Sequence, residues 1–388
     1  MNIYINGKII LENDILENHI LVADHKIQKI CPVESYDIHE KDKVIDLDGH
    51  YLSPGFINVH IHGSNGYDTM DATQEAMEAI AAVLPASGVT SFLATTMTMP
   101  KENIYKALQC AKNFMADPSN KGAELLGIHA EGPFISAQYK GAQDPQYILA
   151  PDYKFYEPFY DIIKIITLAP ESDLDFDFAK ALHEKHPEIV LSIGHSSANY
   201  EKAMEAFSHG IRHITHLFNA MTGLHHRNPG IVGAALTEDF YTELIADNIH
   251  VRPELYKMLL KAKGKDHLIL ITDAMCAACL KPGLYELGGQ EVIVDETSAR
   301  LHSGVLAGSI LTMDQALRNI HDYTSLTLYE TVNLATKNPA EELGLYHQLG
   351  SIDIGKDADL VVFDDQFTIK QTYCKGQLTY LKEDTNAN

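Results

Sequence analysis

The chain has 388 residues, of which 45% are hydrophobic and 21% are charged. This composition is typical of a globular protein and excludes a disordered chain. Asp and Glu number 53 against 30 Lys and Arg, which gives a net charge of −23. So acidic a chain disfavours a nucleic-acid partner or an anionic membrane surface, since both require a basic patch. An anionic small substrate remains compatible, because a pocket can be locally positive.

The N-terminal residues MNIYINGKII lack the basic segment and the long apolar segment of a secretion signal. No stretch approaches the roughly 20 apolar residues that a membrane span requires. The five cysteines are odd in number and scattered along the chain, which argues against a disulfide framework. We therefore expect a cytoplasmic protein that does not associate with membranes.

Short strands separated by turns are predicted at both ends of the chain. Near the N-terminus, apolar residues 3–5 run into Asn6-Gly7, a dipeptide typical of hairpin turns. Near the C-terminus, an apolar run at 359–364 precedes a second strand pair at 373–380. Because chain ends often lie close together, the two sets can join. We predict a small β-sandwich domain from residues 1–53 plus 350–388, which leaves 54–349 as a second domain.

The middle of the chain alternates apolar runs of strand length with helix-like stretches such as 73–87 and 200–207. Such alternation indicates parallel βαβ units, and near-continuous apolar runs indicate a sheet buried on both faces. We therefore predict an α/β fold, a (β/α)8 TIM barrel. The alternative is a doubly wound open sheet, but no Gly-rich dinucleotide fingerprint follows the first strand. The eight predicted strands are 55–60, 89–96, 125–130, 162–169, 189–193, 213–218, 242–246 and 267–272.

Metal-ligand residue types stand at the ends of several predicted strands, where a barrel carries its active site. His60 and His62 share one strand face, since residues i and i+2 point the same way. Glu131, His195 and His216 come from the ends of three further strands. Two imidazoles and a carboxylate around an open position form a ligand set of catalytic zinc. A single such residue could be a polar strand cap, but four strands ending this way favour a metal site.

Asp273 interrupts the otherwise apolar run HLILITDAM on the eighth strand. A buried carboxylate requires a partner, because an unpaired charge is costly in a low-dielectric site. A water activated by a metal ion would be such a partner, and Asp273 would accept its proton. The residue types thus predict hydrolysis, with Asp273 as general base and then general acid.

These residues resemble the amidohydrolase superfamily, in which a His-x-His pair follows the first barrel strand and an Asp follows the eighth. Finer motifs, in order along essentially the whole chain, are similar to the N-acetylglucosamine-6-phosphate deacetylase family. They are HAEGPF (129–134), KGAQ (140–143), GHSSA (194–198), THLFNAM (215–221), RNPG (227–230), IADNIHV (245–251), TDAM (272–275) and LAGSILTMD (306–314).

The resemblance implies hydrolysis of the acetamide of N-acetylglucosamine 6-phosphate, with glucosamine 6-phosphate and acetate as products. It implies that Glu131, His195 and His216 are the main metal ligands and that Asp273 is the catalytic acid and base. Family members carry either His or Gln at the position of Gln143, whose amide could donate a hydrogen bond to the acetyl oxygen. The implied substrate contacts are Ala142, Gln143, Asn219, Ala220, Arg227, His250, Leu306, Ala307 and Gly308.

Two further expectations concern the metal and the assembly. Family members differ in whether they keep the first-strand pair; His60 and His62 are present here, so we expect one or two divalent ions per chain. His and carboxylate ligands suit zinc, our first expectation, but also iron or manganese. The resemblance also implies a homodimer in which Arg227 reaches the phosphate in the neighbouring subunit.

Other hypotheses remain open at this point. The chain could act on the galactosamine 6-phosphate isomer or on another amide, although a neutral cyclic amide would not require the phosphate-binding positions Arg227 and His250. A non-catalytic assembly module is a third possibility, which the complete set of ligand-type residues argues against. Cys276-Ala-Ala-Cys279 is a poor zinc or redox motif without a second pair. His129 could orient a metal ligand or be a buried core residue.

Overall fold

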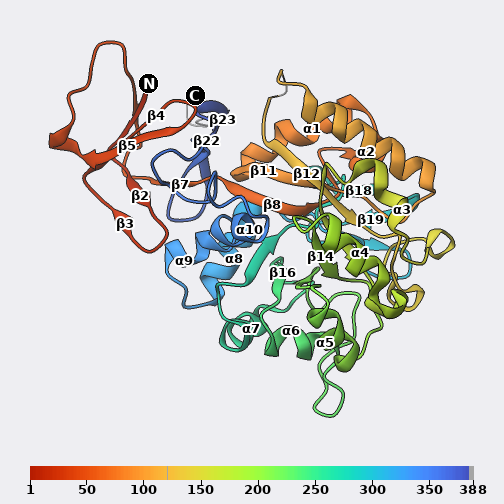
Figure 1. Cartoon of the computed structure of the whole chain (residues 1–388). Coiled ribbons are helices and arrows are strands. Elements are labelled where there is room, and N and C mark those ends of the chain that lie inside the picture. Colours follow the sequence, from red (N-terminus) through yellow and green to blue (C-terminus); the bar gives the residue numbers. More distant parts are fainter. Residues whose placement is uncertain (120, 384–388) are drawn as a thin grey trace.

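The computed structural model describes residues 1–119 and 121–383, and its centre is an eight-stranded parallel sheet curled into a barrel (Figure 1). The strands pair in chain order, and the sheet closes where the Asp273 N–H donates to the His60 carbonyl at 2.9 Å. The predicted (β/α)8 barrel is therefore confirmed. Its strands are β8 (Phe56–Ile61), β11 (Val89–Thr95), β12 (Glu124–Glu131), β13 (Ile163–Leu168), β14 (Val190–Ile193), β15 (His213–Ile214), β16 (Tyr241–Ile245) and β17 (Leu268–Ile271).

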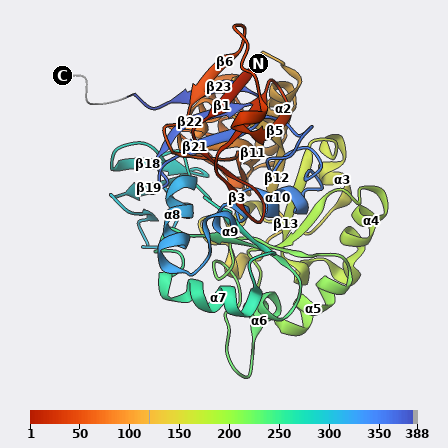
Figure 2. The same ribbon diagram turned by 90° about the vertical axis from the view of Figure 1, so that its left-hand side faces the viewer.

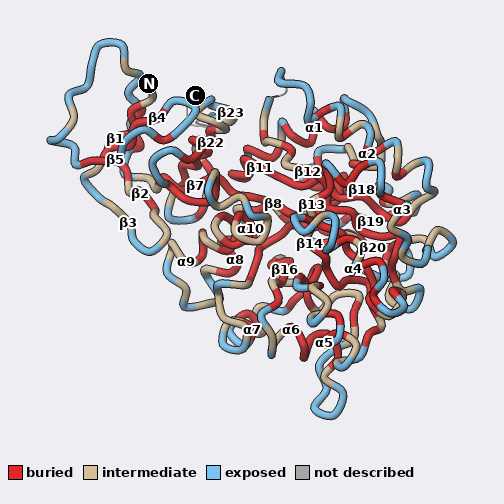
Figure 3. The backbone as a smooth tube through the Cα atoms, viewed as in Figure 1, coloured by how far each residue is buried: buried red, intermediate tan, exposed pale blue. Residues whose placement is uncertain are grey.

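Helices surround the barrel and cover the outer faces of its strands (Figure 1). In α1, Thr73 accepts a hydrogen bond from the Ala76 N–H at 3.1 Å, and the helix buries Met77 and Ile80 on one face. Every residue of β8, β11 and β17 is buried, whereas many connecting loops are exposed (Figure 3). The helices are α1 (Gln74–Val83), α2 (Lys101–Ala116), α3 (Tyr153–Tyr156), α4 (Asp177–Lys185), α5 (Tyr200–Ser208), α6 (Gly230–Thr237), α7 (Tyr256–Lys263), α8 (Met313–Tyr323), α9 (Leu328–Asn333) and α10 (Lys337–Glu342).

Several barrel strands are one or two residues shorter than predicted, and the sixth is four residues shorter. The apolar run 213–218 suggests six residues, but β15 ends at Ile214. His216, Phe218 and Ala220 have φ angles of 32°, 78° and 50°, in the left-handed region. Residues with such angles cannot continue an extended strand. The chain instead turns into the loop that carries His216.

Two further sheets form a domain from both chain ends, as predicted: one consists of N-terminal strands, and the other joins N-terminal with C-terminal strands. In Figures 1 and 2 the red N-terminal strands lie beside the blue C-terminal ones. The rings of Tyr4 and Tyr373 meet edge to face at 5.2 Å in their shared core. The four-stranded sheet has the order β5 (Ile27–Pro32), β4 (His19–Ala23), β1 (Asn2–Ile5) and β6 (Lys43–Asp46). The six-stranded sheet has the order β23 (Gln377–Leu381), β22 (Ile369–Cys374), β21 (Leu360–Phe363), β7 (Tyr51–Pro54), β2 (Lys8–Ile10) and β3 (Ile15–Leu16).

For the extent of this terminal domain we propose residues 1–53 with 350–388, of which 384–388 lie outside the described residues, and 54–349 for the barrel domain. Two small sheets lie in the segments of chain that follow β8 and β17. One pairs β9 (Gly63–Ser64) with β10 (Tyr67–Asp68), and the other joins β18 (Gly283–Leu287), β19 (Gln290–Val294) and β20 (Ala299–Leu301). Among the described residues, none of the helices has the length and apolar character to cross a membrane.

Candidate active site

A cavity of about 570 Å³ opens at the C-terminal ends of the barrel strands. This is the end at which enzymes with this fold carry their active sites, because loops from several strands converge there. Most of the site residues predicted from sequence line it: His62, Glu131, Ala142, Gln143, His195, His216, Asn219, Ala220, His250, Asp273, Leu306 and Gly308.

Three of the predicted residues do not line this cavity. His60 lies deeper in the barrel and is fully buried, as is Ala307. Arg227 lies on an exposed loop, where its Nη1 atom is 2.6 Å from Nε2 of His226. The structure therefore brings His60 to the inner side of the site but leaves Arg227 outside the cavity of its own barrel.

Glu131, His195 and His216 form a tight group at the base of the cavity. The Oε1 atom of Glu131 lies 3.0 Å from Nε2 of His195 and 3.1 Å from Nε2 of His216. The two Nε2 atoms are 3.1 Å apart. Ligand atoms bound to one tetrahedral zinc ion are separated by about 3.3 Å, given bonds near 2.0–2.1 Å. The spacing of the three side chains thus fits a single bound ion.

Backbone geometry explains how these side chains reach one place. His195, His216 and Asp273 each stand two residues beyond the end of their strand, after β14, β15 and β17. All three have positive φ angles, of 48°, 32° and 49°. This conformation is uncommon outside glycine and costs roughly 1–3 kcal/mol, so the surrounding structure must hold it. Such local strain is typical of functional sites.

A second group joins His60, His62 and Asp273 beside the first. The Oδ1 atom of Asp273 is 3.4 Å from Nε2 of His60 and 3.3 Å from Nε2 of His62. Glu131 lies between the groups, with Oε1 3.8 Å from His60 Nε2 and Oε2 3.5 Å from His62 Nε2. The two groups are therefore adjacent, and a carboxylate could serve both.

In both groups, the atoms that face one another are imidazole nitrogens and carboxylate oxygens, which can bind a proton or a metal cation. His60 Nε2 and Asp273 Oδ1 are buried and have no hydrogen-bond partner among the described residues. Burial alone would lower the pKa of His216, but the Glu131 carboxylate raises it to about 9. The pKa of His62 likewise rises to about 9, because Asp273 and Glu131 outweigh the effect of burial. A site that favours extra protons so strongly favours a cation, and the donor set therefore fits a divalent metal ion.

The two carboxylates remain ionised in these surroundings. Burial would raise the pKa of Glu131, but His195 and His216 hold it well below its ordinary value. Burial acts in the same direction on Asp273, and His60 and His62 lower its pKa below the ordinary value. Both carboxylates are therefore charged at neutral pH and available to a cation.

Gln143 lines the cavity and is held there by two hydrogen bonds to the protein. Its Nε2 donates to Oε2 of Glu131 at 3.0 Å, and its Oε1 accepts from the Thr98 N–H at 2.8 Å. The Thr98 bond sets the orientation of the amide, because a backbone N–H requires the oxygen to face it. In this structure Gln143 thus orients the Glu131 carboxylate.

Sequence reasoning missed three features of the site. Lys140 is the one Lys or Arg side chain among the described residues that line the cavity. The β18–β20 sheet contributes Leu287 and Leu301 to the cavity wall. Glu243 lies fully buried in β16, 2.9 Å from Nδ1 of His60. A carboxylate within the apolar run around Glu243 was the available signal, the same signal that identified Asp273.

His129, whose role the sequence left open, is a structural residue. Nδ1 of His129 lies 3.0 Å from the Val59 carbonyl and Nε2 lies 2.7 Å from the Thr167 hydroxyl. Burial, together with the nearby His60, lowers the pKa of His129 to about 3, so the ring is neutral. His129 is therefore a buried residue with both nitrogens occupied, packed against the His60 ring at 4.5 Å.

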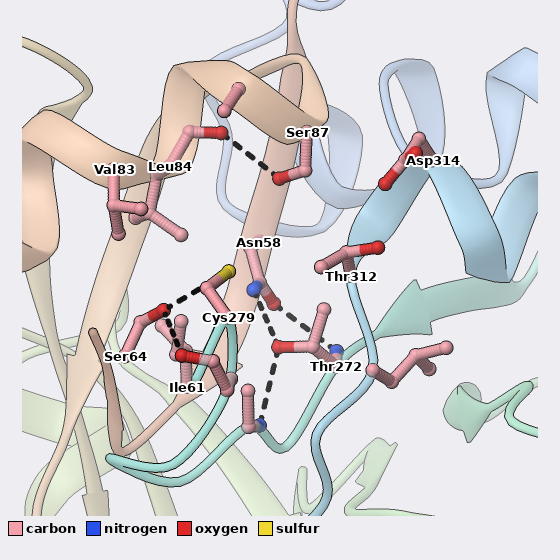
Figure 4. A pocket seen from close by; sticks show the side chains of 14 residues that line it. Asn58, Ile61, Ser64, Val83, Leu84, Ser87, Thr272, Cys279, Thr312 and Asp314 are labelled. Carbon is pink, nitrogen blue, oxygen red and sulfur yellow. Dashed lines mark hydrogen bonds between the residues drawn. The ribbon is translucent and has the colours of Figure 1, made fainter. Parts of the chain in front are cut away.

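The two cysteines of the CxxC sequence have separate partners. Cys276 donates from its thiol to the Glu286 carbonyl at 3.2 Å, whereas Cys279 lies 3.8 Å from the Ser64 hydroxyl. Cys279 lines a separate cavity of about 190 Å³ behind β8, where Asn58 donates to Thr272 at 2.8 Å (Figure 4). The candidate metal groups found among the described residues contain no cysteine. The pair therefore has no ligand geometry in this structure.

Comparison with known proteins places this site in a family. The N-acetylglucosamine-6-phosphate deacetylase of Bacillus subtilis strain 168 is 40% identical over 386 residues, 97% of each chain. The N-acetylgalactosamine-6-phosphate deacetylase of Escherichia coli O157:H7 is 34% identical, over 96% of this chain and 97% of its own. A crystal structure of N-acetylglucosamine-6-phosphate deacetylase from Pasteurella multocida matches with a TM-score of 0.91 and 32% identity, covering 97% of this chain and 99% of that one. The amidohydrolase family model matches residues 51–379. The chain thus belongs to the amidohydrolase family.

Proposed function

We propose that the protein hydrolyses the acetamide of N-acetyl-D-glucosamine 6-phosphate to D-glucosamine 6-phosphate and acetate. The observation that carries this proposal is the group of Glu131, His195 and His216 at the base of the cavity, with Asp273 beside it. Similarity to the deacetylases over nearly the full length supports the substrate class. The reaction belongs to amino-sugar metabolism.

The side chains divide the work of the reaction. A divalent ion held by Glu131, His195 and His216 would polarise the amide carbonyl and activate a water nucleophile. Asp273 is ionised and accepts the proton of the attacking water. It then donates that proton to the amine nitrogen as the C–N bond breaks. Gln143 holds Glu131 in place through the 3.0 Å hydrogen bond.

The metal content follows from the two adjacent groups. Glu131, His195 and His216 form the principal site, and His60, His62 and Asp273 form a second one. We propose zinc in the principal site and one or two ions per chain. Iron or manganese would suit the same imidazole and carboxylate ligands, so the choice of metal is part of the test.

Substrate binding would involve both subunits of a homodimer. Lys140 lines the cavity of its own chain, as does His250, whose ring is held by Asp247 at 2.6 Å. Arg227 is exposed, and a guanidinium can bind a phosphate through two parallel hydrogen bonds. We place the partner's Arg227 at the substrate phosphate. Asn219 and Ala220 would contact the sugar from the loop after β15, and Ala142 and Leu306 from other loops that line the cavity.

One relative supports a second substrate. The Escherichia coli protein named above is an N-acetylgalactosamine-6-phosphate deacetylase, and its identity to this chain is 34%. N-acetylgalactosamine 6-phosphate, which differs from N-acetylglucosamine 6-phosphate at one sugar carbon, is therefore the alternative substrate. As for cellular location, all five cysteines are free thiols, which supports a reducing compartment and hence the cytoplasm.

The deciding experiment measures acetate release and metal content in the same sample. The substrates are N-acetylglucosamine 6-phosphate, its galactosamine epimer and the two unphosphorylated sugars. Glu131→Gln should lose both metal and activity, because Glu131 is the anionic member of the principal site. Glu188→Gln is the control, since Glu188 is an exposed carboxylate beside His186. A Glu131→Gln protein that kept its metal and activity would contradict the assignment.

A further inference from the structure

A buried carboxylate lies beneath both metal-ligand groups. Glu243 projects from β16 inside the barrel and is 0% exposed. Its Oε2 atom lies 2.9 Å from Nδ1 of His60 and accepts from the backbone N–H of His216 at 3.0 Å. A single oxygen atom therefore holds one residue of each group.

The charge of Glu243 is balanced on its other side. Its Oε1 atom lies 3.2 Å from Nε2 of His213, whose Nδ1 lies 3.1 Å from Oε1 of Glu342 on α10. Burial alone would lower the pKa of His213, but the two carboxylates raise it to about 9. The His213 ring is therefore cationic at neutral pH. Four residues form a buried chain that begins on α10 and ends at His60: Glu342, His213, Glu243 and His60.

This chain determines which nitrogen of His60 is free. A carboxylate accepts hydrogen bonds, so Nδ1 of His60 must carry the proton that Glu243 binds. The lone pair then lies on Nε2, which faces Oδ1 of Asp273 at 3.4 Å. A histidine ligand is commonly oriented in this way by a carboxylate on its other nitrogen.

We propose that Glu243, with its counter-charge His213, is a positioning residue that holds His60 in the tautomer able to bind a second metal ion. The inference rests on the second metal site of His60, His62 and Asp273 proposed above. It extends that arrangement, because the same Glu243 oxygen also fixes the loop of His216. Occupation of the second site thus depends on residues that do not touch the ion.

An ion bound by Glu243 itself is the competing reading of the same cluster. His60, His129 and Glu243 have ligand atoms close enough to hold one. However, Nδ1 of His129 faces the Val59 carbonyl at 3.0 Å and Nε2 faces Thr167 at 2.7 Å. With Nδ1 protonated toward a carbonyl, His129 has no lone pair to offer on that side. The cluster is therefore a hydrogen-bonded support.

The test compares metal binding in wild type and two variants of this chain. In Glu243→Gln, the amide must turn its NH₂ group toward either His60 or the cationic His213, and either arrangement breaks the chain. In His213→Gln, a neutral amide replaces the ring that lies 3.2 Å from Oε1 of Glu243, so the carboxylate that binds Nδ1 of His60 loses its partner on the other side. Glu341→Gln is the matched control, because Glu341 precedes Glu342 on α10 and pairs with Lys337 at 3.8 Å.

Zinc per chain is measured after dialysis against graded chelator concentrations, with circular dichroism and thermal unfolding of the metal-free proteins. We expect the affinity for the second ion to fall about 10- to 100-fold in Glu243→Gln, with the first ion retained. If that variant does not fold, the same selective loss in His213→Gln supports the proposal.

Wild-type affinity for two ions in a folded variant would overturn the proposal. Parallel loss of both ions together with a lower melting temperature would also overturn it, since that result indicates a structural role alone. A wild-type protein that binds one ion only would refute the second metal site and this inference with it. The acetate assay reports on the deacetylase reaction separately, so failure of one proposal is distinguishable from failure of the other.

Discussion

Replacing Asp359 with asparagine tests how much a buried carboxyl group lowers the free energy of unfolding where the terminal sheet meets the barrel. Asp359 precedes β21 and is buried. Its Oδ1 accepts from the Lys375 N–H at 2.7 Å, while Oδ2 has no hydrogen-bond partner among the described residues. Burial raises its pKa from 3.8 to about 7, and the nearby Glu124 and Asp357 act in the same direction. Asparagine would keep the oxygen that Lys375 requires and remove the charge.

The sign of the effect follows from proton binding. Between pH 4 and pH 7 the folded chain keeps a proton on Asp359 that the unfolded chain releases, so the free energy of unfolding falls as pH rises. The shift from 3.8 to about 7 is about 3 pKa units. At 1.36 kcal/mol per unit, the cost above pH 7 is at most roughly 4 kcal/mol. The Asp359→Asn protein should gain up to that amount at pH 8 and nothing below pH 4.

Thermal or urea unfolding at pH 4, 6 and 8 measures this difference. Asp364→Asn is a control of opposite sign at the other end of β21. Burial opposes its ionisation, but Lys370 at 2.8 Å and two backbone N–H groups lower the pKa of Asp364 to about 2. Its replacement should therefore destabilise the protein above pH 4. An Asp359→Asn protein that differs from wild type equally at pH 4 and pH 8 would refute the reasoning.

Three further predictions concern catalysis. Asp273→Asn should bind substrate but lower kcat by about 10²- to 10⁴-fold, because an amide cannot accept the proton of water; a kcat within a few-fold of wild type would remove Asp273 from the mechanism. In the double variant His60→Gln with His62→Asn, one ion and substantial activity should remain, as measured by metal analysis and acetate release; complete metal loss would assign the pair to the principal site. Arg227→Ala should reduce kcat/KM for the 6-phosphate roughly 10- to 100-fold, the value of charged hydrogen bonds, and far less for the unphosphorylated sugar. Mixed dimers of Arg227→Ala and Asp273→Asn subunits should regain activity, because one hybrid site has both residues intact; hybrids that form without regaining activity would place Arg227 in the site of its own subunit.

Sequence alone predicted the barrel because its strands are buried on both faces. A run such as Leu268–Ile271, entirely apolar, is recognisable without any knowledge of its neighbours. The site residues were equally accessible, since the C-terminal ends of barrel strands converge and metal chemistry needs His, Asp and Glu there. His195, His216 and Asp273 could therefore be named from their places at the ends of predicted strands.

Tertiary structure alone decided how those residues are supported. The early end of β15 depends on left-handed backbone angles at His216 and Phe218, which an apolar run does not reveal. Gln143 contacts Glu131 because a loop returns over the cavity, a path set by packing. Glu243 and His213 meet across neighbouring strands inside the barrel. Along a strand buried on both faces, alternation no longer distinguishes the inner side from the outer, so only the closed barrel shows which polar residues face each other.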